Sequence, residues 1–341
     1  EYKSAIRPLE VPLWNFMYGD SSGSMYYVCN ARVHDKDLRD GRNQERAGWQ
    51  SGNQWRGVIP FDELPGVENP ASGFLMNTNV MPWNVTIGAG LNRESIPASL
   101  VDPDSIELNG RGKRAMELLA SNEKKTLRDA LAIATDLKVP DASSFITAMK
   151  EDYEQLARAG HPFKNEREIV RAFDILQAWD QTAGTAEAGM TILAVEAKLQ
   201  AAAEIPMSPA EALDAALGML KTWYGTIEIP WGEIHRLKKG KHDHAVGGGT
   251  RELPALWMAD GPLNDGKIVC DFGSSFTMLV RFCPDGRTEA FSIVPYGSSE
   301  RPDSSHFADQ MPLKSRGELK RAWFDRSDIE AHSFSKKVIR S

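Results

Sequence analysis

The chain has few cysteines, no excess of positive over negative charge and no long apolar run, and each of these features excludes a class of protein. Its 341 residues include three cysteines (Cys29, Cys270 and Cys283), which are too few for a disulfide scaffold and lack the spacing of metal ligands. The formal net charge of -7 disfavours a nucleic-acid partner, because nucleic-acid-binding surfaces are basic. No apolar run approaches the roughly 18 residues that a membrane-spanning helix needs, so no membrane span is predicted.

Hydrophobic periodicity divides the chain into strands, then helices, then strands again. Residues 14–18 and 25–33 predict a hairpin around the turn sequence Asp20-Ser21-Ser22-Gly23. Apolar residues at helical spacing predict helices near 111–120, 125–137, 142–158, 166–180, 187–204 and 209–224. The last third predicts strands within 266–273, 274–283 and 287–297. Because a parallel α/β protein would alternate strands with helices, this order indicates an α+β fold.

The same pattern suggests three segments of one continuous domain fragment. These are a sheet portion at 1–110, a helical region at 111–225 and a second sheet portion at 226–341. Within the helical region, Ser208 followed by Pro209 and Glu211 is typical of a capped helix start. No internal repeat of fixed period is present.

Three histidines near the end of the helical region are candidates for a metal site. His235, His242 and His244 lie between residues 231 and 250, but neighbouring lysines would repel a cation and no second cluster completes a ligand set. A solvated loop is the favoured interpretation. The glycines at 247–249 lack the strand-to-helix context of a phosphate-binding loop.

The remaining candidates each allow two interpretations. Asp102 and Asp104 flank a proline and could bind calcium through oxygen, or form a capped turn. Ser274 and His306 are not brought together by any spacing, and a buried, hydrogen-bonded His306 in a compact turn is favoured over a Ser-His-Asp triad. Cys270 could pair with Cys283 across a hairpin, although a place in the apolar core is favoured.

One asparagine-rich stretch, NPASGFLMNTNVMPW at residues 69–83, stands out because it places Asn77 and Asn79 two positions apart. On an extended strand both carboxamides would point to the same face. They could serve as donors to a reactant, or simply satisfy the polar groups of a turn.

Long motifs around this stretch carry a family resemblance. WRGVIPFDELPGVENPASGFLMNTNVMPW resembles the core signature of the penicillin acylase family of N-terminal-nucleophile hydrolases. Three further blocks resemble the family in the same order, and they are NFMYGDSSGSMYYVCNARV, WGEIHRL and the C-terminal region with PYGSSERPDSSHFADQ and WFDRSDIEAH. The resemblance covers nearly the whole chain, although the helical middle matches only in general pattern.

This resemblance implies both a fold and a chemistry. The fold would be part of a four-layer αββα hydrolase, with antiparallel sheets and a helical insertion. Members hydrolyse amide bonds of N-acylated small molecules through an N-terminal Ser whose own amine is the base. Matched residue by residue, Asn79 takes the place of an oxyanion-hole donor and Arg111 that of a supporting residue beside the active site. Asn77 and Trp83 become candidates for substrate binding.

The family also implies partners, a location and a substrate range. Its nucleophilic Ser opens the β chain upstream of the hairpin and has no match in these 341 residues. The chain is therefore expected to be a C-terminal part of a β subunit, inactive alone and completed by the rest of the β subunit and the α subunit of the same precursor. A non-catalytic binding or assembly module is the alternative.

The expected location is the periplasm or the exterior, and no cofactor is required beyond a structural calcium with Asp102 or Asp104 as candidate ligands. The motifs WGEIHRL and SHFADQ resemble the branch of aculeacin and acyl-homoserine lactone acylases somewhat more than benzylpenicillin enzymes. The expected role is the degradation of antibiotics or quorum signals.

Overall fold

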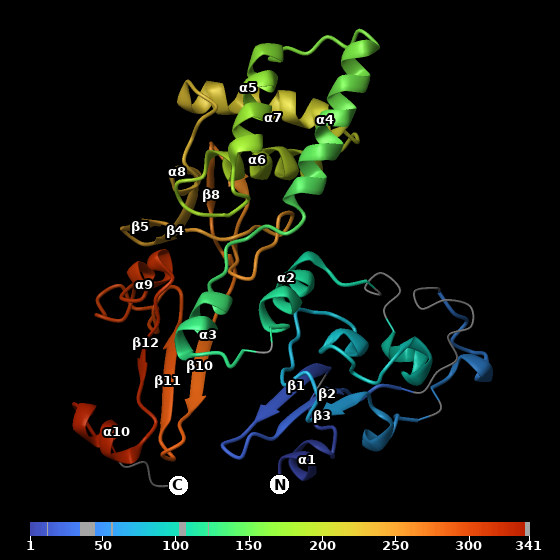
Figure 1. The fold of residues 1–341 in the computed structure, drawn as a ribbon, viewed down its shortest axis with the longest axis vertical. Coiled ribbons are helices and arrows are strands. Elements are labelled where there is room, and N and C mark those ends of the chain that lie inside the picture. The colour runs from blue at the N-terminus through green and yellow to red at the C-terminus, as the bar shows by residue number, and fades with distance from the viewer. Residues whose placement is uncertain (12, 35–44, 56, 102–106, 122, 338–341) are drawn as a thin grey trace. The chain divides into compact units, whose positions relative to one another are not determined.

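The chain divides into two compact units, Glu1–Lys124 and Lys125–Ser341. The structure is a computed structural model that describes every residue except 12, 35–44, 56, 102–106, 122 and 338–341 (Figure 1). Both units mix helices with small sheets, so the predicted α+β class is confirmed. The division into segments at residues 110 and 225 stays a prediction.

The first unit is built on the predicted hairpin. Strand β1 (Trp14–Gly19) pairs antiparallel with β2 (Met25–Asn30), which pairs antiparallel with β3 (Gly66–Glu68). Gly23 adopts a φ of +87° in the connecting turn, a conformation that glycine adopts without steric cost. The other elements of this unit are α1 (Tyr2–Ile6), α2 (Gly110–Leu119) and the 3-10 turns η1 (Ser51–Asn53), η2 (Phe61–Glu63), η3 (Pro82–Asn84), η4 (Arg93–Ser95) and η5 (Ala98–Leu100).

The core of this unit lies on strand β2. Tyr27 and Val28 are fully buried there, and the apolar side chains of η2 and of the loops after β3 cover them. The core of the unit therefore forms between β2 and the largely irregular chain that follows β3.

The helices of the second unit follow the predicted periodicity. They are α3 (Leu127–Ala134), α4 (Ala142–Arg158), α5 (Glu166–Ala178), α6 (Ala188–Ala202) and α7 (Pro209–Tyr224), and each lies within two or three residues of its predicted range. Figure 1 shows α4 to α7 gathered in one group. Helix α6 is buried on all sides between Gly189 and Glu196, as expected for a helix that is apolar all round.

The predicted start of α7 is confirmed in detail. The Ser208 side chain accepts a hydrogen bond from Glu211 N at 3.3 Å, and Ser208 N donates to Glu211 Oε2 at 2.9 Å. Gly225 ends the helix in a left-handed conformation with φ of +74°. No helix in the described part of the chain combines the length and the apolar character needed to cross a membrane.

Short strands make up the rest of the second unit. Four of them form the sheet β5-β4-β8-β7, three form β10-β11-β12 and two form β6-β9. Their bounds are β4 (His235–Lys239), β5 (His242–Ala245), β6 (Ala259–Asp260), β7 (Leu263–Asn264), β8 (Lys267–Val269), β9 (Phe272–Gly273), β10 (Thr277–Phe282), β11 (Thr288–Ile293) and β12 (Lys320–Ala322). Three short helices complete the unit, α8 (Trp231–Ile234), α9 (Met311–Arg316) and α10 (Arg326–His332).

The prediction of a solvated loop between residues 231 and 250 is wrong. Helix α8 starts this segment, and β4 and β5 pair antiparallel as a hairpin around Gly240, whose φ is +56°. The final glycines serve close packing of the backbone, because a Cβ on Gly249 would lie 2.3 Å from Ala255 N. The high content of His and Lys thus reflects a half-exposed hairpin.

Candidate active site

The asparagine-rich segment of the first unit is a turn, and the predicted extended strand is wrong. Asn79 has a φ of +63°, in the left-handed region that asparagine tolerates better than most residues. Its backbone N–H donates to Asn77 Oδ1 at 2.9 Å, and Asn77 Nδ2 donates to Val80 O at 3.4 Å. Asn77 therefore holds the turn with both ends of its carboxamide.

The start of helix α2 is fastened to this turn. Asn109 caps the helix, because its Oδ1 accepts from Gly112 N at 2.8 Å while its Nδ2 donates to Thr78 O at 2.8 Å. Gly112 permits the close approach, since a Cβ there would lie 2.7 Å from Leu108 Cδ2 and 3.1 Å from Val80 Cγ1. The helix and the turn thus form one rigid element.

Arg111, in helix α2, binds the turn through both Asn79 and Thr78. Its Nη2 donates to Asn79 Oδ1 at 2.8 Å and to Thr78 O at 3.1 Å. Partial burial lowers the pKa of Arg111, although a guanidinium stays charged at any physiological pH. Because Arg has donors only, the carboxamide oxygen must face it, and the Asn79 Nδ2 group faces away.

This arrangement presents an oriented, uncharged donor. Among the described residues, Asn79 Nδ2 has no hydrogen-bond acceptor, and the Asn79 side chain is exposed on the surface of the first unit. A fixed donor that points outward can stabilise a negative oxygen developing on a reactant. The structure therefore brings Asn79 and Arg111 into contact, while their roles in an active site stay a prediction.

For the other predicted site residues, the structure does not test the predicted role. Trp83 lies in η3 and packs in part against the core of the first unit. Substrate binding by Asn77 and Trp83 stays a prediction. Asp102 and Asp104 lie outside the described residues, so calcium binding also stays a prediction. Within the described ranges, no group of three His, Cys, Asp or Glu side chains could hold a metal ion.

His235 is an internal residue of the second unit, contrary to its predicted place in a solvated loop. It is fully buried, and its ring stacks on Trp231 with centroids 4.3 Å apart. Nδ1 lies 2.7 Å from Val246 O and Nε2 lies 2.8 Å from Ala259 O. Burial lowers the pKa of His235 to about 4, although the two hydrogen bonds to backbone carbonyls favour the protonated ring.

Ser274 and His306 do not form a triad. Ser274 Oγ accepts from Met258 N at 3.2 Å, and His306 Nδ1 pairs with Asp309 Oδ2 at 2.9 Å. The predicted hydrogen bond of His306 is confirmed, but its predicted burial is wrong, because 58% of the side chain is exposed. All three cysteines are free, and Cys270 is buried in the core of the second unit.

Comparison with known proteins identifies the family. The family model described as penicillin amidase matches residues 1–331. The chain belongs to the penicillin amidase family. This family contains amidohydrolases that act as penicillin and acyl-homoserine lactone acylases, and its members are processed heterodimers.

Two curated relatives are similar to this family member in sequence, and one solved structure is similar in fold. The chain is 22% identical over 303 residues to the acyl-homoserine lactone acylase PvdQ of Pseudomonas fluorescens, a match that covers 81% of this chain and 38% of that protein. It is 32% identical over 65 residues to the penicillin acylase 2 proenzyme of a Pseudomonas species, covering 19% of this chain and 8% of that protein. This family member thus spans well under half the length of the curated relatives that it matches.

The structural comparison supports the same fold. The thermostable penicillin G acylase from Alcaligenes faecalis aligns with a TM-score of 0.56 at 16% identity, and the alignment covers 96% of this chain and 67% of that chain. The fold of this penicillin amidase family member is therefore that of a penicillin G acylase over nearly its whole length.

Sequence reasoning missed the residues that hold the turn of the candidate site against the start of helix α2. Thr78, Asn109 and Gly112 were not predicted to act there, although Asn109-Gly110-Arg111-Gly112 was part of the motif that pointed to Arg111. An asparagine directly before an Arg- and Gly-containing helix start is a cap signal that could have found Asn109.

Proposed function

We propose that the complete protein is an acylase that hydrolyses the amide bond of N-acylated small molecules, and that this chain supplies the oxyanion donor Asn79. The contact between Arg111 Nη2 and Asn79 Oδ1 at 2.8 Å is the observation that carries the proposal. It fixes which end of the carboxamide is available, which is the requirement for an oxyanion-hole donor.

The mechanism that this geometry supports has two similar halves. A serine hydroxyl attacks the amide carbonyl while the serine's own α-amine takes up the hydroxyl proton, the carbonyl oxygen becomes negative, and Asn79 Nδ2 donates to it. Collapse of this intermediate breaks the C–N bond, the α-amine passes its proton to the departing amine, and an acyl-enzyme remains. Water then attacks the ester carbonyl, the same donor stabilises the second oxyanion, and the acid is released.

Arg111 acts as a positioning residue in this scheme. Its two contacts restrain both the carboxamide and the backbone of the turn at Thr78, so the donor needs little reorganisation when charge develops. Its positive charge also strengthens the Asn79 dipole in the direction that the oxyanion requires.

The nucleophile in this proposal is the N-terminal Ser of the family's β chain, carried by sequence other than these 341 residues. The partners are accordingly the remaining part of the β subunit and the α subunit of the same precursor, which together would complete a four-layer αββα fold. The proposed location is the periplasm or the exterior. A non-catalytic binding module is the second candidate, and the oriented Asn79 donor argues against it, since a binding module has no need of a preorganised oxyanion donor.

Acyl-homoserine lactones with aliphatic acyl chains are the proposed substrate class. The match to PvdQ over 81% of this chain supports it, against a match over 19% to the penicillin acylase 2 proenzyme. β-Lactams and acylated lipopeptides are the alternatives within the same reaction type.

Replacing Asn79 in the complete enzyme tests the proposal. Asn79→Ala should lower kcat by about 10²–10³ with little change in KM, because the hydrogen bond matters chiefly in the transition state. Arg111→Met should also lower kcat, since the carboxamide loses its fixed orientation. Asn264→Ala and Lys113→Met are matched controls, because both side chains are exposed and neither takes part in the hydrogen bonds among Asn77, Asn79 and Arg111.

Three outcomes separate the possibilities. A loss for Asn79→Ala that falls entirely on KM would assign Asn79 to substrate binding and overturn the oxyanion role. The isolated chain should be inactive on acyl-homoserine lactones and chromogenic N-acyl amides, and addition of the complementary subunit portion should restore turnover. A serine-directed covalent inhibitor that labels Ser274 or Ser275, with turnover by this chain alone, would refute the mechanism.

A further inference from the structure

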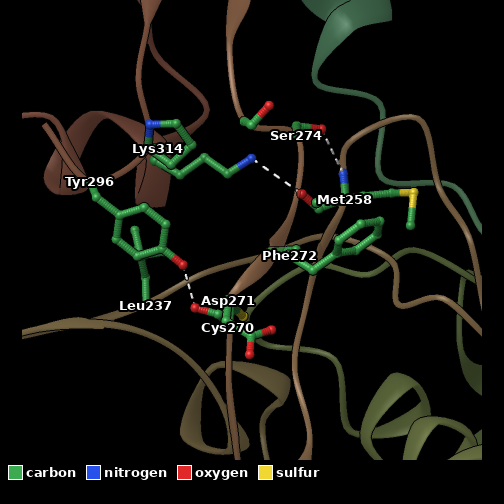
Figure 2. Close-up of a pocket in the computed structure, with 12 residues that line it drawn as sticks. Leu237, Met258, Cys270, Asp271, Phe272, Ser274, Tyr296 and Lys314 are labelled. Carbon is green, nitrogen blue, oxygen red and sulfur yellow. Dashed lines mark hydrogen bonds between the residues drawn. The ribbon is translucent and has the colours of Figure 1, made fainter. Parts of the chain in front are cut away.

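The second unit contains a pocket whose lining residues have no role in the proposed acylase reaction. Its volume is about 240 Å³, and it lies among β9, the chain after β11 and helix α9 (Figure 2). Apolar side chains make most of its wall, and Lys314, Ser274 and the Tyr296 hydroxyl are polar groups in the lining. Neither Asn79 nor Arg111 belongs to it.

Lys314 is buried in this wall without a carboxylate partner. It is 2% exposed, and no ion pair to its Nζ occurs among the residues that the structure describes. Lys198 of the same unit, whose side chain is 9% exposed, pairs with Glu252 at 3.2 Å and with Asp260 at 2.8 Å. Buried ammonium groups are almost always paired in this way, so Lys314 departs from the rule that Lys198 follows.

The contacts of Lys314 leave donors unused. Its Nζ lies 3.3 Å from the centroid of the Trp257 ring and donates to Met258 O at 3.4 Å. An ammonium carries three N–H groups, and a single long hydrogen bond to a carbonyl uses only one of them. Figure 2 shows the Lys314 side chain reaching along the pocket toward the Met258 carbonyl.

The other polar groups limit the charge of what could bind. Ser274 Oγ accepts from Met258 N, so its hydroxyl proton remains available to donate to a ligand. The Tyr296 hydroxyl already donates to Cys270 O. Asp271 is exposed at the pocket and would repel an ion of high negative charge. A single negative charge suits one lysine and one hydroxyl.

We propose that this pocket binds a small organic monocarboxylate, with its carboxylate on Lys314 Nζ and its apolar part against Phe272 and Tyr296. The volume is below the range of about 300–1,000 Å³ that drug-sized ligands occupy, so the ligand is a short-chain or single-ring acid. The carboxylate supplies the counter-ion that Lys314 lacks, and the apolar wall covers the remainder of the molecule.

Binding at this place is coupled to a proton. Burial lowers the pKa of Lys314 to about 7, and a carboxylate beside the amine favours its charged form. Burial raises the pKa of both Cys270 and Tyr296 to about 12, so neither neighbour changes charge near neutral pH. At pH 8 the amine is mostly neutral before binding and charged afterwards, so binding should take up close to one proton.

Titration calorimetry of the full chain with hexanoate tests the proposal. We expect a Kd of about 0.1–1 mM, a range suited to so small a ligand, and no binding of the neutral analogue hexanamide. Lys314→Met keeps the length of the side chain without its charge and should weaken hexanoate binding at least tenfold. Lys320→Met is the matched control, because Lys320 is exposed on β12, and it should bind as the unchanged protein does.

The proton count keeps the test decisive if Lys314→Met does not fold. Titrations at pH 8 in two buffers of different ionisation enthalpy should give an uptake of nearly one proton per hexanoate bound. Absence of binding up to about 10 mM hexanoate, equal binding of hexanamide, or binding without proton uptake would each overturn the proposal. Preferential binding of inorganic phosphate would also overturn it, because the pocket would then select a more highly charged anion.

Discussion

Replacing Lys314 by methionine should change how the stability of the protein depends on pH. In the folded protein burial lowers the pKa of Lys314 from 10.5 to about 7. In the unfolded chain the amine returns to its ordinary value and binds its proton more tightly. The unfolded state therefore carries more protons than the folded state between these two pH values, and stability must rise with pH across that interval.

The size of the effect follows from the shift. One pKa unit corresponds to about 1.4 kcal/mol, so the charged form of Lys314 destabilises the folded state by at most about 5 kcal/mol at pH values below 7. Between pH 7 and pH 8.5 this penalty declines by about 1.6 kcal/mol as the folded amine loses its proton. The Lys314→Met variant has no such group, so its stability should lack this contribution.

The difference between the two proteins isolates Lys314 from the other shifted groups. Burial raises the pKa of Glu196 to about 7 and lowers that of His235 to about 4, but both titrate alike in the two proteins and cancel. Urea unfolding followed by tryptophan fluorescence at pH 7.0, 7.5, 8.0 and 8.5 measures the difference. These pH values are about half a unit apart, which resolves a slope of roughly 1 kcal/mol per pH unit.

The pH dependence of the stability difference decides whether Lys314 has a lowered pKa. The stability of the unchanged protein relative to Lys314→Met should grow by about 1.6 kcal/mol across the range, and relative to the exposed control Lys320→Met it should stay constant. A wild-type minus Lys314→Met difference that is flat within about 0.5 kcal/mol would show that the ammonium keeps an ordinary pKa. Lys314 would then have an anionic partner in the protein itself, and the inferred ligand site would be refuted with it.

Two further variants test the packing of the helical group. Gly189→Ala places a Cβ 2.5 Å from Trp179 Cγ and should destabilise the second unit by about 1–3 kcal/mol in urea unfolding, whereas an unchanged midpoint would mean that the Trp179 ring moves freely. Ser208→Ala removes the side-chain acceptor for Glu211 N and should cost about 1 kcal/mol, while Ser208→Asp, which can still cap the helix, should retain stability.

The sequence predicted elements whose signals are local. The helices of the second unit and the hairpin at Gly23 follow from apolar spacing and from cap or turn residues, which act within a few positions of the chain. The β4–β5 hairpin was missed because its His and Lys residues are typical of loops, while its burial depends on contacts such as the stacking of His235 on Trp231.

Long-range packing was beyond the reach of sequence pattern. The missing counter-ion of Lys314 depends on which side chains other segments bring to helix α9, and no spacing within one segment encodes that. The resemblance to the penicillin amidase family made Asn79 and Arg111 candidates but could not give the hydrogen bond between them, because the two residues lie 32 positions apart.

Under the proposed function, the two interpretations of the paired asparagines apply to different residues of the same turn. Asn77 satisfies the turn, since its carboxamide accepts from Asn79 N and donates to Val80 O. Because Asn77 makes these hydrogen bonds, the Asn79 side chain is not needed to satisfy the backbone of the turn. Arg111 then binds the oxygen of that side chain, and only its N–H donors remain for a reactant. In the proposed mechanism the polar turn therefore preorganises the donor, because Asn77 satisfies the backbone of the turn and the Asn79 amide group is left to bind the oxyanion.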